Sequence, residues 1–241
     1  MIGGERPNQS AATADFEFAA LREARNYRAA LLQEFSPHLR GDIIEVGSGI
    51  GQFTEALVKQ PSVRKILSIE PDPGFCRDFR ERLPGQSLIE GTIDQVPHDQ
   101  PWQAILSLNV LEHILDDEPE LSRFQRLLAS QCGELCLFVP ARPEIYAPID
   151  RDFGHHRRYT KQELRTKLER AGFEVVRLRY FNCVGYLAWW FNFCLLKKRS
   201  FDAAAVRFFD RGIFPSVYWF ESNLCAPPIG QSLLAVARAR R

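Results

Sequence analysis

Residues 42–51 read Asp-Ile-Ile-Glu-Val-Gly-Ser-Gly-Ile-Gly. The first part has the apolar character of a buried strand, and we expect a helix to begin near Gln52. Glycines occupy the alternate positions 47, 49 and 51. Glycine lets the backbone turn tightly and approach a ligand where a Cβ atom would collide. Since position 52 is Gln, the spacing is G-x-G-x-G and not the G-x-G-x-x-G of NAD enzymes. The stretch predicts a strand, a ligand-binding turn and a helix.

Further strand and helix signals alternate along the rest of the chain. A helix is expected over 15–35, and Asp72 with Pro73 predicts a helix start. Capping-box patterns predict two more starts, at Asp117 with Glu120 and at Thr160 with Glu163. The expected strands are 42–47, 65–70, 87–92, 104–109, 134–139, 174–181 and 232–239, with a polar loop over 140–159. Five β–α units followed by two late strands predict an α/β fold with a doubly wound, mostly parallel sheet.

Composition sets the broad class of the protein. The 241 residues carry a net charge of +1, so no overall field attracts nucleic acid. Six cysteines without a C-x-x-C pair favour free thiols in a reducing compartment, hence a cytoplasmic location. The polar composition of 1–13 predicts a disordered tail without a secretory signal. We expect one domain over 14–241, with 182–231 inserted before the last strand.

Polar or glycine-containing segments end the second, third and fourth expected strands, in addition to the glycine turn of the first. They are 68–72, ending strand two at Glu70; 91–94, ending strand three at Asp94; and 108–113, ending strand four at Asn109. In a doubly wound sheet, ligands bind beyond the carboxyl ends of the strands. The four segments therefore predict one binding site at that edge.

The order and spacing of these segments resemble the successive motifs of class I S-adenosylmethionine (SAM) dependent methyltransferases, over roughly residues 15–181 and, more weakly, the last strand. The resemblance implies a seven-stranded, Rossmann-like methyltransferase fold with an N-terminal helix, and SAM as cofactor. Glu45 and the 47–51 turn would face the methionine moiety, Glu70 the ribose, and Asp94 the adenine. Tyr27 would close over the methionine carboxylate. The implied cofactor residues are Tyr27, Glu45, Gly47, Ser48, Gly49, Gly51, Glu70, Pro71, Thr92, Ile93, Asp94, Asn109 and Leu111.

A second cluster lies in the expected loop between strand five and its helix. Residues 154–159 resemble a G-H-x-R-R-Y segment found in a subgroup of these enzymes. Its histidine, His155, suits proton acceptance because its unperturbed pKa lies near working pH. The resulting catalytic candidates are His155, Tyr159 and His113, and Tyr146 and Arg158 are substrate-binding candidates. Alternatively, Arg157 and Arg158 pair with Asp150 and Asp152 and only hold the loop, and His113 hydrogen-bonds the glycine turn.

Residues 182–231 are rich in large aromatic side chains, and we expect this insertion to be helical. Three interpretations remain open: a lid and pocket for a lipophilic acceptor, in which Trp189 and Trp190 bind substrate; a dimer interface or plain packing; and contact with a membrane surface, the least favoured. The charge-free run 180–196 is too short and too polar to span a bilayer.

These observations favour a SAM-dependent methyltransferase of secondary metabolism, acting on an oxygen or nitrogen atom of a small or medium-sized, lipophilic or aromatic molecule. The expected partners are that acceptor and at most a second copy of the chain, with no metal site. One alternative uses the same cofactor site to close a ring within SAM and release methylthioadenosine. Another is a non-catalytic SAM-binding subunit.

Overall fold

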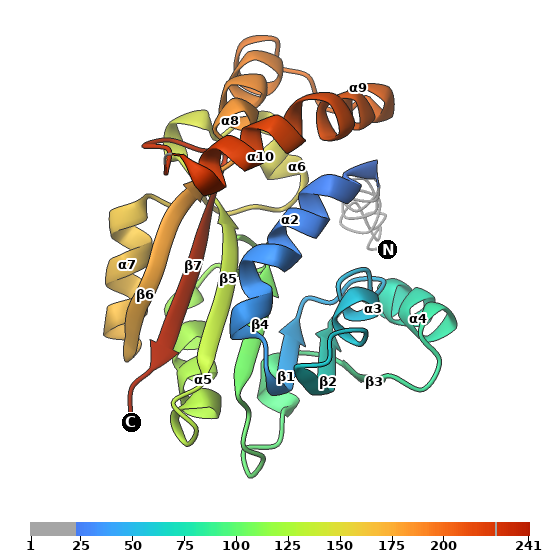
Figure 1. Cartoon of the computed structure of the whole chain (residues 1–241), viewed down its shortest axis with the longest axis vertical. Helices are drawn as coiled ribbons and strands as arrows, with labels where there is room; N and C mark the ends of the chain where they lie inside the picture. The colour runs from blue at the N-terminus through green and yellow to red at the C-terminus, as the bar shows by residue number, and fades with distance from the viewer. Residues whose placement is uncertain (1–22, 225) are drawn as a thin grey trace, which may run out of the picture.

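The computed structural model describes residues 23–224 and 226–241, so the predicted tail and the start of the helix predicted over 15–35 lie outside the described residues. The described strands form one seven-stranded sheet in the order β3-β2-β1-β4-β5-β7-β6 (Figure 1). They are β1 (Gly41–Val46), β2 (Val63–Glu70), β3 (Ser87–Glu90), β4 (Ala104–Leu108), β5 (Glu134–Pro140), β6 (Phe173–Phe181) and β7 (Ser232–Ala239). Strand β7 runs antiparallel to β5 and β6, and the other pairs are parallel. The predicted doubly wound sheet is confirmed.

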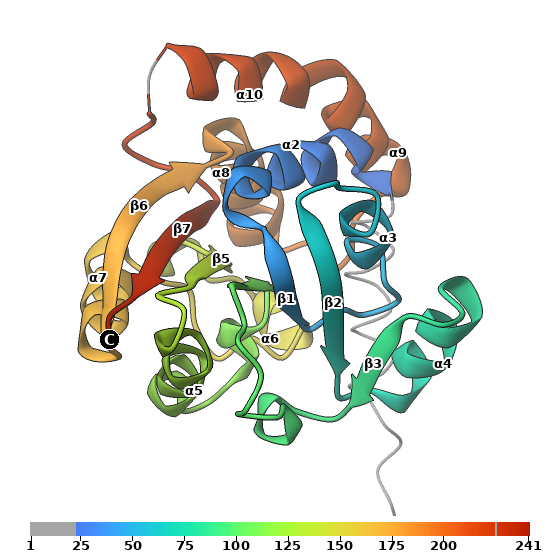
Figure 2. The same ribbon diagram turned by 60° about the horizontal axis from the view of Figure 1, so that its bottom comes forward.

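Helices cover both faces of this sheet. They are α2 (Arg25–Phe35), α3 (Thr54–Leu57), α4 (Pro73–Arg82), α5 (Asp117–Ala129), α6 (Pro148–Asp152), α7 (Lys161–Arg170), α8 (Cys183–Trp189), α9 (Ala203–Phe208) and α10 (Phe214–Asn223), with two π-helical segments, η5 (Trp190–Leu195) and η6 (Phe209–Ile213). On one face, α5 and α7 bury Phe124 and Leu164 against the sheet. On the other, α2 and α10 bury Leu31 and Phe214, and Figure 2 shows these two helices side by side.

Local capping explains where several helices begin. The Asp72 carboxylate accepts hydrogen bonds from the backbone N–H groups of Gly74 and Phe75, and the Thr160 hydroxyl accepts one from Glu163 N–H, as predicted. The helix predicted to start at Asp117 does start there, but the predicted capping box is absent. The Asp117 carboxylate accepts hydrogen bonds from the Tyr159 hydroxyl and Lys167 Nζ, both at 2.6 Å.

The segment expected to be a polar loop, 140–159, contains the short helix α6. Ile145 and Phe153 of this segment are buried together with Trp189 and Phe193. They form an apolar cluster that is separate from the clusters on the two faces of the sheet. The segment was misjudged because its apolar residues pack against the insertion, which starts 23 positions after the segment ends. The insertion and this segment therefore share a small apolar cluster.

The insertion itself, residues 182–231, leaves the end of β6, forms α8 to α10 and returns into β7. Figure 1 shows these helices beyond the carboxyl ends of the parallel strands. The Asp210 carboxylate ties the insertion to α2, accepting hydrogen bonds from the backbone N–H groups of Asn26 (3.0 Å) and Tyr27 (2.9 Å). The N-cap residue of α2, Ala24, makes no side-chain cap bond. A residue 184 positions away therefore caps the first turn of α2.

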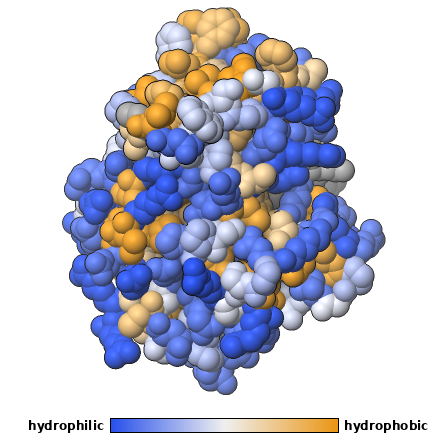
Figure 3. Space-filling model, in the orientation of Figure 1, coloured by the Kyte–Doolittle hydropathy of each residue, from blue (hydrophilic) through white to orange (hydrophobic). Residues whose placement is uncertain are grey.

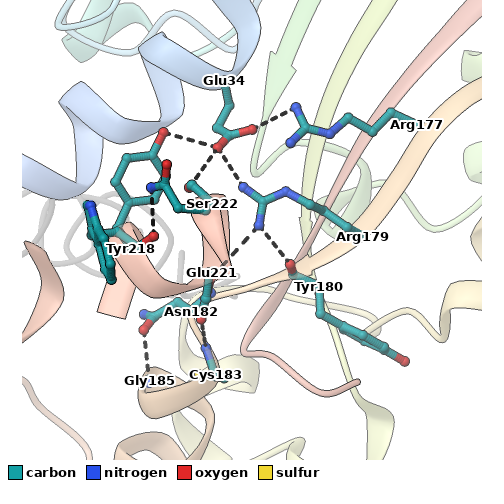
Figure 4. Close-up of polar contacts among 12 residues, drawn as sticks. Glu34, Arg177, Arg179, Tyr180, Asn182, Cys183, Gly185, Tyr218, Glu221 and Ser222 are labelled. Carbon is teal, nitrogen blue, oxygen red and sulfur yellow. Dashed lines mark hydrogen bonds and ion pairs between the residues drawn. The ribbon is translucent and has the colours of Figure 1, made fainter. Parts of the chain in front are cut away.

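A buried polar network fixes the insertion to α2 and β6 (Figure 4). Glu34 on α2 accepts hydrogen bonds from Arg179 Nη2 at 2.6 Å and from the Tyr218 hydroxyl of α10 at 3.0 Å, and it pairs with Arg177 at 2.7 Å. Glu221 accepts the backbone N–H groups of Asn182 and Cys183, at the start of α8. Both carboxylates are buried and partnered, so the two ends of the insertion have defined positions.

Among the described residues, no helix combines the length and the apolar character needed to cross a membrane.

Candidate active site

The glycine turn after β1 has the backbone geometry that only glycine adopts easily. Gly47, Gly49 and Gly51 all have positive φ, at 74°, 52° and 79°. A Cβ atom on Gly47 would overlap the side chain of Val110, and one on Gly51 would overlap Leu83 and Phe79. The turn therefore packs directly against the segment after β4, so the first and fourth expected motifs meet there.

Glu70 joins the turn to the end of β2. Its carboxylate accepts hydrogen bonds from the N–H of Gly49 at 2.8 Å and the N–H of Asp72 at 3.0 Å. Burial raises the pKa of Glu70, and these two bonds oppose the rise. A carboxylate has lone pairs left for further donors, such as ribose hydroxyls. Pro71 follows it and is exposed.

Glu45 lies beneath the turn. Its carboxylate accepts a hydrogen bond of 2.5 Å from the Thr54 hydroxyl and one of 3.4 Å from the Ser68 hydroxyl. Burial raises the pKa of Glu45 to about 7, although these hydroxyls lower it. Within the described residues, the structure gives the neighbouring Ser48 hydroxyl no hydrogen-bond partner, although it is buried.

The residues predicted to surround the adenine are Thr92, Ile93 and Asp94, and Leu111 was predicted to line the sulfonium side of SAM; their side chains differ in exposure. Thr92 is exposed, and Asp94 pairs with Arg123 at 2.5 Å. Ile93 and Leu111 are buried in the core on one face of the sheet, so their side chains are not exposed in the cofactor crevice. Burial of two apolar side chains is a tertiary effect that a local motif does not reveal.

Asn109 lines a cavity beyond the strand ends. It follows β4 with a φ of 52°, a left-handed conformation that asparagine tolerates better than most residues. The cavity has a volume of about 650 Å³, is open to the surface and is lined by residues of the strand ends and the insertion. Its wall includes Tyr27, Asn109, Glu112, His155, Arg158, Trp189, Phe193, Lys198 and Phe209.

Asp150 organises the chemistry of the cavity wall. Its Oδ1 atom lies 3.0 Å from His155 Nδ1 and accepts a hydrogen bond from Arg158 Nε at 2.9 Å. Its Oδ2 atom accepts the N–H of Ala147. The pKa of Asp150 is lowered: burial opposes the lowering, but the bonds from His155 and Arg158 outweigh it. An anionic Asp150 keeps the proton of His155 on Nδ1 and leaves Nε2 as the acceptor atom.

His155 Nε2 lies 4.0 Å from Glu112 Oε1, and Glu112 is fully buried. The exposed ring of His113 meets that of His155 edge-on, with centroids 4.7 Å apart. One ligand atom from each of these three residues lies within 4.8 Å of the others, so the group could hold a divalent ion such as Zn²⁺. The sequence analysis predicted no metal site and did not select Glu112, because His155 is 43 positions away from it.

Four predicted site residues occupy other positions. Tyr159 is fully buried, does not line the cavity, and donates its hydroxyl proton to Asp117, so we withdraw it from the catalytic candidates. Tyr146 supports the His155 loop by donating its hydroxyl proton to the His155 carbonyl. Trp190 is exposed outside the cavity. Tyr27 does line the cavity, packed against Phe138, Phe181 and Phe214.

The loop-holding alternative for the arginines is half right. Arg158 pairs with Asp150 at 2.8 Å and lies over the ring of Trp189. Arg157 instead pairs with Asp117 at 3.3 Å, and Asp152 pairs with Arg199.

A doubly wound sheet with a three-glycine turn at the end of β1 and an acidic residue at the end of β2 defines a cofactor-binding enzyme of the class I methyltransferase type. The chain belongs to the methyltransferase domain family, which residues 20–178 match. This membership confirms the predicted resemblance and implies SAM as the methyl donor. The chemistry of the site fits that cofactor, since the Glu70 carboxylate has lone pairs left for ribose hydroxyls and the buried Ser48 hydroxyl has no partner among the described residues.

Two curated relatives are trans-aconitate 2-methyltransferases. The protein from Rhodopseudomonas palustris is 28% identical over 100 residues, which are 41% of this chain and 38% of that protein. The protein from Methylobacterium nodulans is 28% identical over 87 residues, which are 36% and 34%. The chain thus matches little more than a third of the length of these relatives.

Solved structures share the fold over nearly the whole chain. A methyltransferase from Haloferax volcanii, solved in complex with the Trm112 methyltransferase activator, has a TM-score of 0.65 at 16% identity, covering 99% of this chain and 100% of that one. A SAM-dependent methyltransferase from Thermotoga maritima has a TM-score of 0.59 at 17% identity, covering 97% and 100%. Such identities support the fold and leave the acceptor open.

Proposed function

We propose that the protein transfers the methyl group of SAM to an oxygen or nitrogen atom of a small or medium-sized lipophilic molecule. The observation that carries the proposal is the paired Asp150 and His155 on the wall of a 650 Å³ cavity. Asn109 lies in that wall at the end of β4, and Val110 beside it packs against the glycine turn. A bound acceptor would therefore lie next to the methyl donor.

Bound SAM supplies a methyl group already activated by the sulfonium, so the protein has to orient the acceptor and take its proton. His155 Nε2 would accept that proton from an O–H or N–H group as the acceptor atom bonds to the methyl carbon and the carbon–sulfur bond breaks. Asp150 stabilises the imidazolium that forms. Asn109 would position the acceptor, and His113 contributes through its contact with His155.

The cavity wall favours a neutral or cationic acceptor. The guanidinium of Arg158 is already paired with Asp150, and Lys198 donates a hydrogen bond to the Asn192 side chain at 2.8 Å. Glu112 lies near His155 and would repel a carboxylate. This differs from the tricarboxylate named for the two curated relatives. An alcohol, phenol or amine with an apolar body suits Trp189, Phe193 and Phe209 better.

In this proposal, residues 14–241 form one domain, and residues 182–231 serve as its lid and acceptor pocket. Several insertion residues line the cavity, including Ala188, Asn192 and Val206. Ring closure within SAM would need no external acceptor, so a cavity of this size favours methyl transfer. The G-H-x-R-R-Y segment supports a biosynthetic role through the subgroup it resembles, and monomeric and dimeric forms both fit.

The test incubates the full chain with SAM and separate sets of alcohols, phenols, amines and carboxylates, and identifies products by mass spectrometry. S-adenosylhomocysteine together with a methylated acceptor is the expected result, whereas methylthioadenosine would indicate ring closure. His155→Ala should lower turnover by about two to four orders of magnitude with SAM affinity retained. His156→Ala is the matched control, because His156 is the adjacent, exposed histidine.

Repeating the reaction with a chelator separates proton acceptance by His155 from metal binding. Full activity with chelator and loss in His155→Ala supports the proposal. Equal turnover of His155→Ala and His156→Ala would rule out His155 as the proton acceptor. Absence of any methylated product across all sets, with SAM bound, would favour the non-catalytic alternative.

A further inference from the structure

The outer end of the insertion carries a compact group of exposed apolar side chains. Trp190, Phe191, Leu195 and Leu196 are 47%, 49%, 54% and 50% exposed. Lys197, Lys198 and Arg199 follow at once and are exposed too. We call residues 190–199 the insertion tip. Figure 3 shows apolar residues gathered at the end of the molecule where Figure 1 places this segment.

Packing inside the insertion does not account for these side chains. Trp189 and Phe193 point inward and pack against Phe201, so the apolar cluster of the insertion is formed by other side chains than those of the tip. The side chains at 190, 191, 195 and 196 face outward on the π-helical segment and the residue after it. Helix α10, which contacts α8, exposes Trp219 and Phe220 as well. A monomer seldom exposes such a group without a partner.

The charges around the tip are almost all positive. Residues 183–224, all described by the structure, contain five basic and three acidic side chains. Two of the acidic ones, Asp210 and Glu221, are buried and accept backbone N–H groups. Asp202 is the remaining exposed carboxylate of this range. Arg199 and Arg207 pair with Asp152 and Glu23 from outside this range, so the unpaired positive charge of the insertion includes Lys197 and Lys198 of the tip.

We propose that the insertion tip binds the surface of an anionic phospholipid bilayer. Aromatic and aliphatic side chains next to lysines are the composition of segments that lie in the interface between headgroups and acyl chains. Trp190, Phe191, Leu195 and Leu196 insert at that boundary, and Lys197 and Lys198 contact lipid phosphates. Arg199 is already paired with Asp152, so the two lysines supply most of the attraction.

The position of the tip connects the membrane to the cavity. Asn192, Lys198 and Ser200 belong to the tip or follow it, and all three line the cavity wall. A lipophilic acceptor dissolved in the bilayer would reach the cavity without crossing water. This inference goes beyond the proposed function, and its test needs neither SAM nor an acceptor, so the two can fail separately.

The test is cosedimentation of the full chain with vesicles of phosphatidylcholine alone or mixed with phosphatidylglycerol. Binding to the mixed vesicles is expected, weaker on neutral ones and weakened by salt. The double variant Phe191→Ser with Leu195→Ser should lose about tenfold or more in affinity. The matched control is Val58→Ser with Val176→Ser, which removes two apolar side chains of 39% and 48% exposure elsewhere and should bind normally.

Replacing Lys197 and Lys198 by Gln should remove the preference for phosphatidylglycerol, whereas Lys59→Gln with Lys161→Gln should keep it. Absence of vesicle binding by the folded wild-type chain would overturn the proposal. So would equal binding of the tip and control variants. Light scattering that shows a dimer abolished by Phe191→Ser with Leu195→Ser, without vesicle binding, would assign the tip to a second copy of the chain.

Discussion

Glu70 accepts two backbone hydrogen bonds, one from Gly49 in the glycine turn and one from Asp72 at the start of α4. It therefore both shapes the glycine turn and presents an anion to a ligand. We expect Glu70→Ala to weaken SAM binding by about 1–3 kcal/mol, through loss of charge-assisted hydrogen bonds to ribose. Titration calorimetry with SAM measures this.

The matched control for Glu70→Ala is Glu90→Ala, since Glu90 ends the adjacent strand β3 and pairs with Arg80 on the surface. Its affinity for SAM should equal that of the wild type. If both variants bind SAM equally well, Glu70 contributes only to the turn.

Glu45 predicts a pH dependence of stability. Burial raises its pKa in the folded protein to about 7, so the folded state holds a proton that the unfolded state releases at lower pH. Stability from this group is present at low pH and falls as pH rises through 7, by up to about 3 kcal/mol. Glu45→Gln, which keeps polar contacts with Thr54 and Ser68, should remove that fall.

Urea unfolding at pH 5 and pH 8 measures the free energy of unfolding of the wild type and of Glu45→Gln. The comparison is between the slopes of that free energy against pH for the two proteins. Parallel slopes would mean that Glu45 is ionised in the folded protein across this range.

Residues differ in how well their structural role could be predicted from the sequence. Gly47, Gly49 and Gly51 were predictable because their requirement is local, a positive φ in a tight turn. The pairing of His155 with Asp150 and its approach to Glu112 depend on how the chain after β5 folds back on β4. Tyr159 was chosen from its motif, yet its hydroxyl bonds Asp117 on another helix. Side-chain partners from distant segments are what the sequence leaves out.

At the scale of elements, the start of α2 depends on the insertion. Asp210→Ala removes the carboxylate that accepts the N–H groups of Asn26 and Tyr27, and should lower the free energy of unfolding by about 0.5–2 kcal/mol. Amide exchange at Asn26 and Tyr27 should rise. Asp202→Ala is the control, because Asp202 caps its own helix α9 through Ala204 and Ala205. Asp202→Ala should lower the free energy of unfolding by a similar amount without changing amide exchange in α2. Unchanged amide exchange at Asn26 and Tyr27 in Asp210→Ala would show that α2 has another cap.

Element boundaries were predictable where a cap is local, as at Asp72 and Thr160. Boundaries that depend on tertiary contacts were not predictable. Helix α3 has only four residues, and α6 arises because Ile149 and Phe153 find partners in the insertion. The aromatic insertion was correctly expected to be helical. Which of its aromatic side chains pack inside, line the cavity or are exposed at the tip depends on the three-dimensional structure, so the sequence could not predict it.

At the scale of the molecule, the sheet and the insertion have different sources of stability. The sheet has two continuous apolar faces, which periodicity and strand order allowed the sequence to predict. The insertion is held by a small apolar cluster, by the Asp210 cap and by the carboxylates of Glu34 and Glu221. Those carboxylates gave no sequence signal, because their arginine, tyrosine and backbone partners come from three separate elements.

The strand order also determines the order in which the strands can join the sheet while the ribosome synthesises the chain. Strand β6 pairs with β7 and not with β5, and β7 is the last strand in the chain. Until residues 232–239 emerge and insert between them, the strand that leads into the insertion has no neighbour in the sheet. A nascent chain can therefore pair β1 to β5 early, but β6 and the insertion that follows it join the sheet only once β7 has emerged. A chain without residues 232–239 would keep its glycine turn and lose the strand that connects β6 to the rest of the sheet.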